Sequence, residues 1–254
     1  MHMRYAIIAA GEGSRLAAEG ISAPKPLVKV NGEALIDRLI RVFMDNDAEE
    51  IVVICRSADE LLTDGSTETT QVASHLLALQ RDGLRGRPVP LRFLVKSTPS
   101  SMHSFFEISE HLTSGPFVLT TVDTIFSEEE FSRYVATFQQ LLSDGKADGL
   151  MGVTDYIDDE KPLYVKTDAV DNITAFLDTD PQPHYISAGI YGLTPRSIVT
   201  LKACMERKES RMRNFQRALV ADGLHLKAYP FKKVLDIDHA TDIGKAEAFL
   251  ENSK

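Results

Sequence analysis

The chain has 254 residues, of which 43% are hydrophobic and 26% are charged, and its formal net charge is −9. This size and composition allow a buried core without metal or disulfide staples, so neither a disordered nor a disulfide-dependent protein is expected. The acidic balance argues against a nucleic-acid partner held over a broad surface, but it permits a small anionic ligand in a local positive pocket.

Strands and helices alternate through the first half of the sequence. Short apolar runs predict strands, and apolar residues three to four positions apart predict helices. In chain order we expect strand Arg4–Ala9, helix Ala34–Asn46, strand Ile51–Cys55, helix Gln71–Gln80, strand Leu91–Val95, helix Met102–Leu112, strand Phe117–Thr121 and helix Glu128–Leu142. Ser127 is the expected N-cap of the last of these helices. This order predicts an α/β fold, a Rossmann-like three-layer α/β/α arrangement with a mostly parallel mixed sheet.

The regular alternation of strands and helices ends at about Leu150. We expect strands Leu163–Lys166, Ile173–Leu177 and Tyr185–Leu193, helices near Pro195–Arg207 and Arg213–Asp222, a strand near His225–Tyr229 and a final helix near Ala240–Glu251. The most polar or proline-rich loops are Asp64–Thr70 and Asp178–Pro183. Because no internal repeat or low-complexity linker divides the chain, a single domain over residues 1–254 is expected.

The most informative motif follows the first predicted strand, at Gly11–Arg15. Two glycines separated by one residue allow a tight turn with exposed amides, and amides before a helix start suit a phosphate. Arg15 adds a planar cationic fork, and Lys25 adds a point charge that Pro24 and Pro26 hold in place. The motif therefore predicts a triphosphate site.

A strand-to-helix turn that binds nothing is the alternative. The Walker motif is excluded because no GK[ST] follows the glycines. The dinucleotide fingerprint is incomplete, because Leu16 stands where that pattern needs its third glycine. The prolines beside Lys25 favour the phosphate site, since a solvated surface lysine needs no such constraint.

AAGEGSRL followed by PKPLV resembles the opening motif of the nucleotidyltransferases that make nucleoside-diphosphate sugars. That family's usual form is AGGxGxRL followed by PKxL. The motif is also similar to that of the phosphocholine cytidylyltransferases, and further matches cover nearly the whole chain. The resemblance implies a nucleotide-diphospho-sugar transferase-like fold, with a nucleotide-binding half over about residues 1–125 and an acceptor-binding half over about 126–254. No β-helix or acyltransferase half, which some relatives append, is expected.

Two aspartates are candidate metal ligands. Asp123 follows a predicted strand, where parallel sheets place ligands; its alternative role is that of a helix-capping or turn aspartate. The family usually has GD there, with a metal-binding Asp, and Val122 replaces the glycine. DIDHATDI resembles the family's DIDTPEDL ending, which favours Asp238 as ligand and Asp236 as support; an N-cap role for Asp238 is the alternative. Two carboxylates and phosphate oxygens suit Mg2+.

The resemblance also implies roles in binding the nucleotide. Arg15 is expected to bind the β- and γ-phosphates and Lys25 the α-phosphate in the transition state. Nucleotide contacts are expected from Ala9, Ala10, Gly11, Glu12, Gly13, Ser14, Ser101 and His103. The segment KSTPSSMHSFFEI stands where the family has a GTA-containing segment, so the base is not identified. Ser100, Ser101 and Ser104 are candidate hydrogen-bond donors to base or ribose, and a serine-rich loop that caps the following helix is the alternative.

The acceptor site is less clearly marked. SAGIYGL matches the family's NAGIY segment, in which Gly189 permits close backbone approach; a glycine bulge is the alternative. The lysine that binds a sugar phosphate in the family's EKP motif is missing from LDTDPQP. Lys161 or Lys166 is a candidate replacement, and the acceptor can be a sugar-1-phosphate, phosphocholine or another small phosphate ester.

Together these motifs predict a Mg2+-dependent nucleotidyltransferase that joins a nucleoside monophosphate to a phosphorylated acceptor. A non-catalytic nucleotide-binding module is the main alternative, and a glycosyltransferase of the same fold is a third. The partners are a nucleoside triphosphate and the small acceptor, with no nucleic acid or membrane; a homo-oligomer is possible.

The two cysteines and the N-terminal sequence indicate the cellular location of the protein. Cys55 and Cys204 lack a second Cys or His at metal-ligand spacing, so buried reduced thiols are expected. No signal peptide and no apolar run of membrane-spanning length is present. The sequence therefore predicts a cytoplasmic protein.

Overall fold

The computed structural model describes residues 3–57, 70–157 and 161–252. Most of the polar loop predicted at Asp64–Thr70, and Glu160 of the EKP sequence, lie outside the described residues. In the first half the strands are β1 (Met3–Ala9), β2 (Lys29–Val30), β3 (Glu33–Ala34), β4 (Ala48–Cys55), β5 (Leu91–Val95), β6 (Phe117–Thr121) and β7 (Thr124–Phe126). The helices are α1 (Ser14–Ala18), η1 (Lys25–Leu27), α2 (Leu35–Met44), α3 (Gln71–Asp82), α4 (Ser101–Ile108) and η2 (Ser109–Leu112).

The second half begins with α5 (Glu128–Ser143), which Ser127 caps as predicted. Its strands are β8 (Gly149–Thr154), β9 (Tyr164–Thr167), β10 (Ile173–Leu177), β11 (Tyr185–Leu193), β12 (Leu226–Phe231) and β13 (Val234–Asp236). Its other helices are α6 (Arg196–Glu206), α7 (Met212–Ala221) and α8 (Ala240–Glu251).

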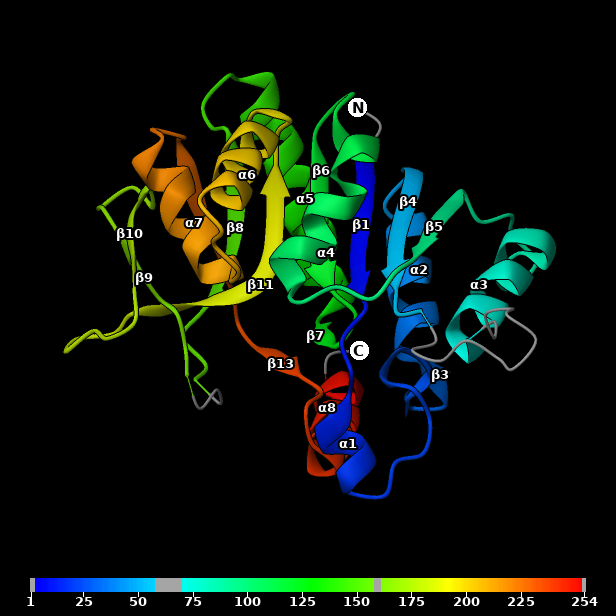
Figure 1. Ribbon diagram of the computed structural model, residues 1–254. Helices are drawn as coiled ribbons and strands as arrows, with labels where there is room; N and C mark the ends of the chain where they lie inside the picture. The colour runs from blue at the N-terminus through cyan, green and yellow to red at the C-terminus, as the bar shows by residue number, and fades with distance from the viewer. Residues whose placement is uncertain (1–2, 58–69, 158–160, 253–254) are drawn as a thin grey trace.

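A nine-stranded mixed sheet runs through both halves of the described chain (Figure 1). Strands β6, β1, β4 and β5 are parallel neighbours. Strand β11 enters antiparallel beside β6 and also pairs with β8 and β9, while β12 lies parallel to β8. All strands of this sheet except β10 and β11 therefore point in the same direction, which confirms the predicted mostly parallel sheet.

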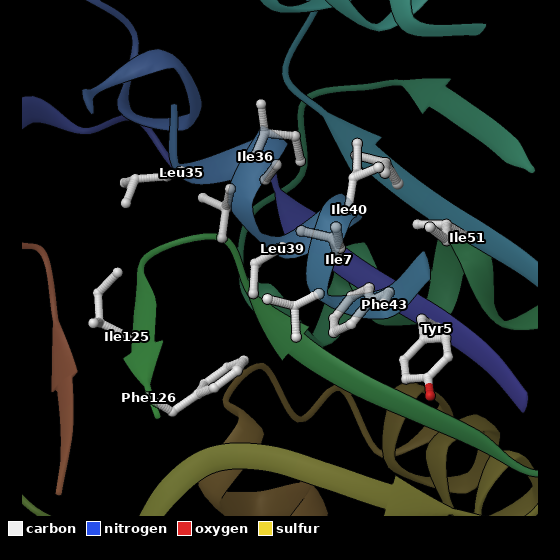
Figure 2. Close-up of a cluster of buried hydrophobic side chains, with 14 of the residues drawn as sticks. Tyr5, Ile7, Leu35, Ile36, Leu39, Ile40, Phe43, Ile51, Ile125 and Phe126 are labelled. Atoms are coloured by element: carbon white, nitrogen blue, oxygen red, sulfur yellow. The ribbon is translucent and has the colours of Figure 1, made fainter. Parts of the chain in front are cut away.

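Two hydrophobic clusters cover the two faces of the sheet. Along β1, Tyr5 and Ile7 face one cluster and Ala6 and Ile8 the other, as alternation in a strand requires. The first cluster joins the sheet to α2 and α5; Figure 2 shows Tyr5 and Ile7 beside α2 side chains such as Phe43. The second joins it to α4, α6 and α7. This confirms the predicted three-layer arrangement.

A second, smaller sheet lies at the edge where the parallel strands β1 and β6 end. Strands β7 and β13 form a separate antiparallel pair there, in which Asp236 lies opposite Thr124. Helices α1 and α8 lie next to each other beyond the same edge, in blue and red at the bottom of Figure 1. Residues from both ends of the chain therefore meet at this edge.

The sequence analysis missed strand β8, although it lies beside β11. Its two glycines, Gly149 and Gly152, weaken the strand pattern. The structure explains them: a Cβ on Gly149 would lie 2.8 Å from the Gly192 carbonyl oxygen, and one on Gly152 would lie 3.0 Å from Ile190 Cβ. The division into two functional halves stays a prediction.

Neither cysteine is in a disulfide, and both are buried, as predicted. Burial raises the pKa of each thiol to about 11. None of the helices described is both long and apolar enough to cross a membrane. The cytoplasmic location stays a prediction.

Candidate active site

The glycine loop connects β1 to the short helix α1. Ala9 and Ala10 are buried at the end of β1, and the chain becomes exposed at Gly11. Gly13 has a φ of +62° and is the N-cap of α1. A Cβ on Gly13 would lie 3.1 Å from Lys25 Cβ, whereas one on Gly11 would meet nothing within 4 Å. The two glycines therefore have different roles. The absence of a side chain at Gly13 lets the loop pack against Lys25, whereas the space beside Gly11 is empty.

The polar side chains of this loop have specific surroundings. Glu12 is exposed and forms an ion pair of 3.3 Å with Arg56, which follows β4. Ser14 is exposed as the first residue of α1. Arg15 is 59% exposed, and its guanidinium lies 3.2 Å from Asp238 Oδ2. The loop is thus joined both to the adjacent strand end and to the C-terminal part of the chain.

Lys25 is the most enclosed cation of the site. It begins η1, whose N-cap is Pro24, and its side chain is only 11% exposed. Its ammonium group lies between two carboxylates: it contacts Asp123 Oδ2 and lies 2.8 Å from Asp238 Oδ1. Burial lowers the pKa of Lys25, but the two aspartates outweigh that effect and raise it above its ordinary value. Lys25 is therefore charged.

The pairing of β7 with β13 brings the two aspartates together. Asp123 lies in the turn before β7, and Asp238 lies two residues after β13. The Ile237 amide donates to the Asp123 carbonyl oxygen at 3.2 Å, which extends the pairing toward the site. Val122 in the turn is buried and does not have a positive φ, so the glycine usual in the family is not needed here.

Asp238 is not the N-cap of the last helix; His239 is. The Asp238 carboxylate instead contacts Arg15 and Lys25, and its role as a metal ligand stays a prediction. Asp236 is exposed on β13 and lines the cavity described below. Its supporting role stays a prediction.

Asp123 and Asp238 offer oxygen ligands of the kind that Mg2+ prefers. Asp123 Oδ1 is buried and has no hydrogen-bond partner, so this oxygen has a free coordination position. No group of three or more His, Cys, Asp or Glu side chains suited to a metal occurs among the described residues. Two carboxylates without a third fit Mg2+, because this ion usually binds through one or two carboxylates, water and substrate phosphates.

A cavity of about 400 Å³ adjoins Asp238 and Arg15. It is lined by Arg15, Thr154, Tyr156, Lys161, Ile186, Ser187, Ala188, Val234, Leu235, Asp236, Asp238, His239, Thr241, Asp242 and Lys245. Lys161 is exposed and lines this cavity, whereas Lys166 of β9 is not among the lining residues. Of the two candidate acceptor lysines, Lys161 is therefore the better placed.

Gly189 lies in β11 next to the lining residue Ala188. It has a φ of +71°, and the pairing of β11 with β8 shifts register between Ser187 and Tyr191. A Cβ at Gly189 would lie 3.6 Å from Thr124 Oγ1. The glycine-bulge alternative is therefore observed, and the acceptor contact stays a prediction.

The serine-rich segment begins α4. Ser100 is the N-cap, and its hydroxyl accepts from the His103 amide, so the capping alternative is observed for Ser100. The His103 ring lies 2.9 Å from Ser100 Oγ, and Ser101 and His103 are both partly exposed. Their contact with the nucleotide stays a prediction.

Sequence reasoning missed several site residues. The lining of the cavity includes Ser187, Thr154 and Thr241, and Glu19 and Asp242 hold the start of α8. The match of Ser187–Leu193 to NAGIY could have drawn attention to Ser187. Nothing in the sequence marks Glu19, since its partners are more than 200 residues away.

The chain is similar to known proteins in both sequence and fold. The family model described as "Nucleotidyl transferase" matches residues 5–254. The inositol-1-phosphate CTP transferase from T. maritima is 18% identical, with a TM-score of 0.76 and coverage of 100% of this chain and 96% of the other. A search of curated proteins finds no match.

Two further solved structures are similar. The CTP:phosphocholine cytidylyltransferase from Streptococcus pneumoniae is 16% identical, with a TM-score of 0.72 and coverage of 98% and 100% of the two chains. The UTP-bound UGPase from Acinetobacter baumannii is 15% identical, with a TM-score of 0.73 and coverage of 98% and 93%. At these identities the likeness shows the fold alone, and it agrees with the fold predicted from the sequence.

Proposed function

The chain belongs to the nucleotidyl transferase family, and we propose that it transfers a nucleoside monophosphate from a nucleoside triphosphate to a phosphorylated small molecule, with Mg2+ and with release of pyrophosphate. The non-catalytic module and the glycosyltransferase, the alternatives that the sequence left open, are not what this family membership indicates. Pyrophosphate release with different pairs of nucleoside triphosphate and acceptor would identify the nucleobase and the acceptor.

One observation carries the proposal: Lys25 lies between Asp123 and Asp238. These residues come from three separate segments of the chain, and the glycine loop adds Arg15 to the same cluster. Two cations and two carboxylates at one sheet edge suit a reaction in which a metal and a triphosphate must be held together. A purely structural ion-pair network would not require Arg15, which is 59% exposed, to reach Asp238 beside an open glycine loop.

The proposed reaction needs no protein nucleophile. A phosphate oxygen of the acceptor attacks the α-phosphorus of the triphosphate and forms a new P–O bond. The bond from the α-phosphorus to the α,β-bridging oxygen breaks, and pyrophosphate leaves with that electron pair. Mg2+, held by Asp123 and Asp238, would neutralise charge on the phosphates.

The two cations have separate proposed tasks. Arg15 binds the β- and γ-phosphates through its planar fork and holds the leaving pyrophosphate. Lys25 contacts the α-phosphate and stabilises the charge that develops there. Both must first leave Asp238, which becomes available to the metal as they turn to the triphosphate.

The cavity chemistry favours a polyhydroxylated acceptor. Most of the described residues that line it are polar, and Tyr156 is the single Phe, Tyr or Trp side chain among them. A quaternary ammonium group is bound best by several aromatic rings, and the described part of the lining supplies one such ring. We therefore propose a sugar or cyclitol phosphate, with Lys161 on its phosphate group.

Pyrophosphate release tests the proposal. The protein is assayed with Mg2+ and each common nucleoside triphosphate, crossed against sugar-1-phosphates, inositol-1-phosphate and phosphocholine. We expect release with one base and one polyol phosphate, and no release when Mg2+ is chelated. Release with phosphocholine alone would overturn the acceptor class but not the reaction. No release with any pair, while the triphosphate still binds, would contradict the reaction.

A further inference from the structure

Both ends of α1 contact the same short segment after β13. At the start of the helix, the Arg15 guanidinium lies 3.2 Å from Asp238 Oδ2. At its end, Glu19 is the C-cap, and its carboxylate has two contacts of 2.6 Å, with His239 Nδ1 and with the Ala240 amide. The glycine loop and the start of α8 are thus fastened at two points.

The proposed reaction affects the contacts at the two ends of α1 differently. Arg15 and Lys25 both contact Asp238 in this structure, and the reaction needs both for the triphosphate. Once they turn to the phosphates, these contacts with Asp238 are lost. The Glu19 contacts use no group that the reaction needs, so they persist through the cycle.

The Glu19 contacts also fix the residue beside Asp238. His239 and Ala240 immediately follow Asp238, and Ala240 is the first residue of α8. A carboxylate that accepts a hydrogen bond at a helix start forms a charge-assisted contact. Asp242 restrains the same turn from within α8, because its carboxylate accepts from the amides of Asp238 and His239. The backbone that carries Asp238 is therefore held by acidic groups from two helices.

We infer that Glu19 is a positioning residue, which keeps Asp238 at a fixed place beside the glycine loop while Arg15 and Lys25 bind the triphosphate. This inference rests on the proposed function. Glu19 is not among the residues that line the acceptor cavity, so it acts through the backbone of residues 238–240 and not on a substrate. Its effect is on the affinity and alignment of the metal that Asp238 would hold.

The test compares Glu19→Ala and Glu19→Gln with wild type. The matched control is Glu209→Ala, which removes another partly exposed glutamate, one that pairs with Arg207 at 2.8 Å and lies outside the candidate site. We expect the Mg2+ concentration for half-maximal pyrophosphate release to rise about tenfold in Glu19→Ala, as is typical when a group that orients a metal ligand is lost. In Glu19→Gln, which keeps one acceptor oxygen, this Mg2+ concentration should lie between the values for wild type and Glu19→Ala. Saturating Mg2+ should restore most of the rate of pyrophosphate release in both variants.

A readout without turnover accompanies the kinetics. Mn2+ binding in the presence of a nucleoside triphosphate, followed by electron paramagnetic resonance, should weaken about tenfold in Glu19→Ala and be unchanged in Glu209→Ala. If wild type releases no pyrophosphate, the proposed function fails, and the Mn2+ titration still decides the role of Glu19.

Two results would overturn the inference. One is an unchanged Mg2+ and Mn2+ dependence in Glu19→Ala. The other is an equal loss in both Glu19 variants that saturating metal does not restore, because that indicates only a structural role. Thermal unfolding of each variant is measured alongside, and if Glu19→Ala does not fold, Glu19→Gln alone decides.

Discussion

The Nζ atom of Lys25 lies 2.8 Å from Oδ1 of Asp238, although 213 residues separate them in the chain. The same ammonium group contacts Asp123, so in this structure a lysine neutralises the two carboxylates proposed as metal ligands. The predictions below follow from this arrangement and from the loops around it.

Replacing Lys25 with Met should have two opposite effects. Turnover should fall at least about 1,000-fold, because the charge that stabilises the transition state is lost. Mn2+ affinity without nucleotide should rise, because Asp123 and Asp238 lose the cation that now lies between them. Pyrophosphate release and Mn2+ titration measure the two effects. Lys29→Met, which changes an exposed lysine nearby, is the control and should alter neither. A fall in Mn2+ affinity in Lys25→Met would contradict this account of the cluster.

The two glycines of the loop should respond differently to alanine. Gly13→Ala should lower the free energy of unfolding by about 1 kcal/mol, because the residue has a φ of +62° and its Cβ would press on Lys25 at 3.1 Å. Gly11→Ala should leave stability unchanged, because its Cβ would meet nothing within 4 Å, but it should weaken triphosphate binding. Urea unfolding and a thermal shift with added triphosphate separate the two. Normal triphosphate binding by Gly11→Ala would show that the phosphates do not approach this backbone.

Much of the fold follows from local patterns. Strands β1, β4 and β6 of the parallel half match predicted segments because buried parallel strands are continuous apolar runs. Helix α2 matches because its apolar residues recur on one face. These signals depend on residues close together in the sequence, which is why they can be read without a structure.

The candidate residues of the site, but not their contacts, could be named from the sequence. Glycine spacing, flanking prolines and a strand-end position mark GEGSR, Lys25 and Asp123, and the family resemblance adds Asp238. The structure brings Arg15, Lys25, Asp123 and Asp238 together, and their roles stay predictions. The pairing of β7 with β13 that does this was missed, since each strand has only three residues. Glu19 was missed because its role depends entirely on the docking of α8 against α1.

Lys161 should matter for the acceptor and not for the triphosphate. Lys161→Ala is expected to raise KM for the acceptor about tenfold or more, because a charge-assisted contact with its phosphate is lost. Lys166→Ala is the matched control, since this lysine is also exposed but does not line the cavity. Steady-state kinetics with each substrate varied in turn make the distinction. If Lys166→Ala raises KM for the acceptor and Lys161→Ala does not, the acceptor lies elsewhere.

Glu128 should make stability depend on pH. Hydrogen bonds from Arg41, at 2.7 and 2.8 Å, lower its pKa below the ordinary value of 4.5. The stabilisation that ionised Glu128 gives the folded protein is therefore complete above pH 4.5, the ordinary pKa. It is lost as the pH falls through the lowered pKa of the folded state. Glu128→Gln should cost about 0.5 kcal/mol near neutral pH, since the side chain is partly exposed and screened.

Urea unfolding of wild type and Glu128→Gln over a range of pH measures this difference. The difference in free energy of unfolding between wild type and Glu128→Gln should shrink on acidification below about pH 4. A gap that stays constant, or widens, in acid would mean that the Arg41 contact does not favour the ionised form. Glu129→Gln, whose partner Arg133 lies on the exposed side of α5, is the comparison and should show a smaller gap.

The central claim is that the α-phosphorus is attacked and pyrophosphate leaves. Phosphorus-31 NMR of the complete reaction, with the triphosphate and acceptor found by the pyrophosphate assay, tests it most directly. The account predicts equal amounts of free pyrophosphate and of a new diphosphate that joins the nucleotide to the acceptor, and neither product with Lys25→Met. Inorganic phosphate and a nucleoside diphosphate as the products would mean attack at the γ-phosphorus and would contradict it.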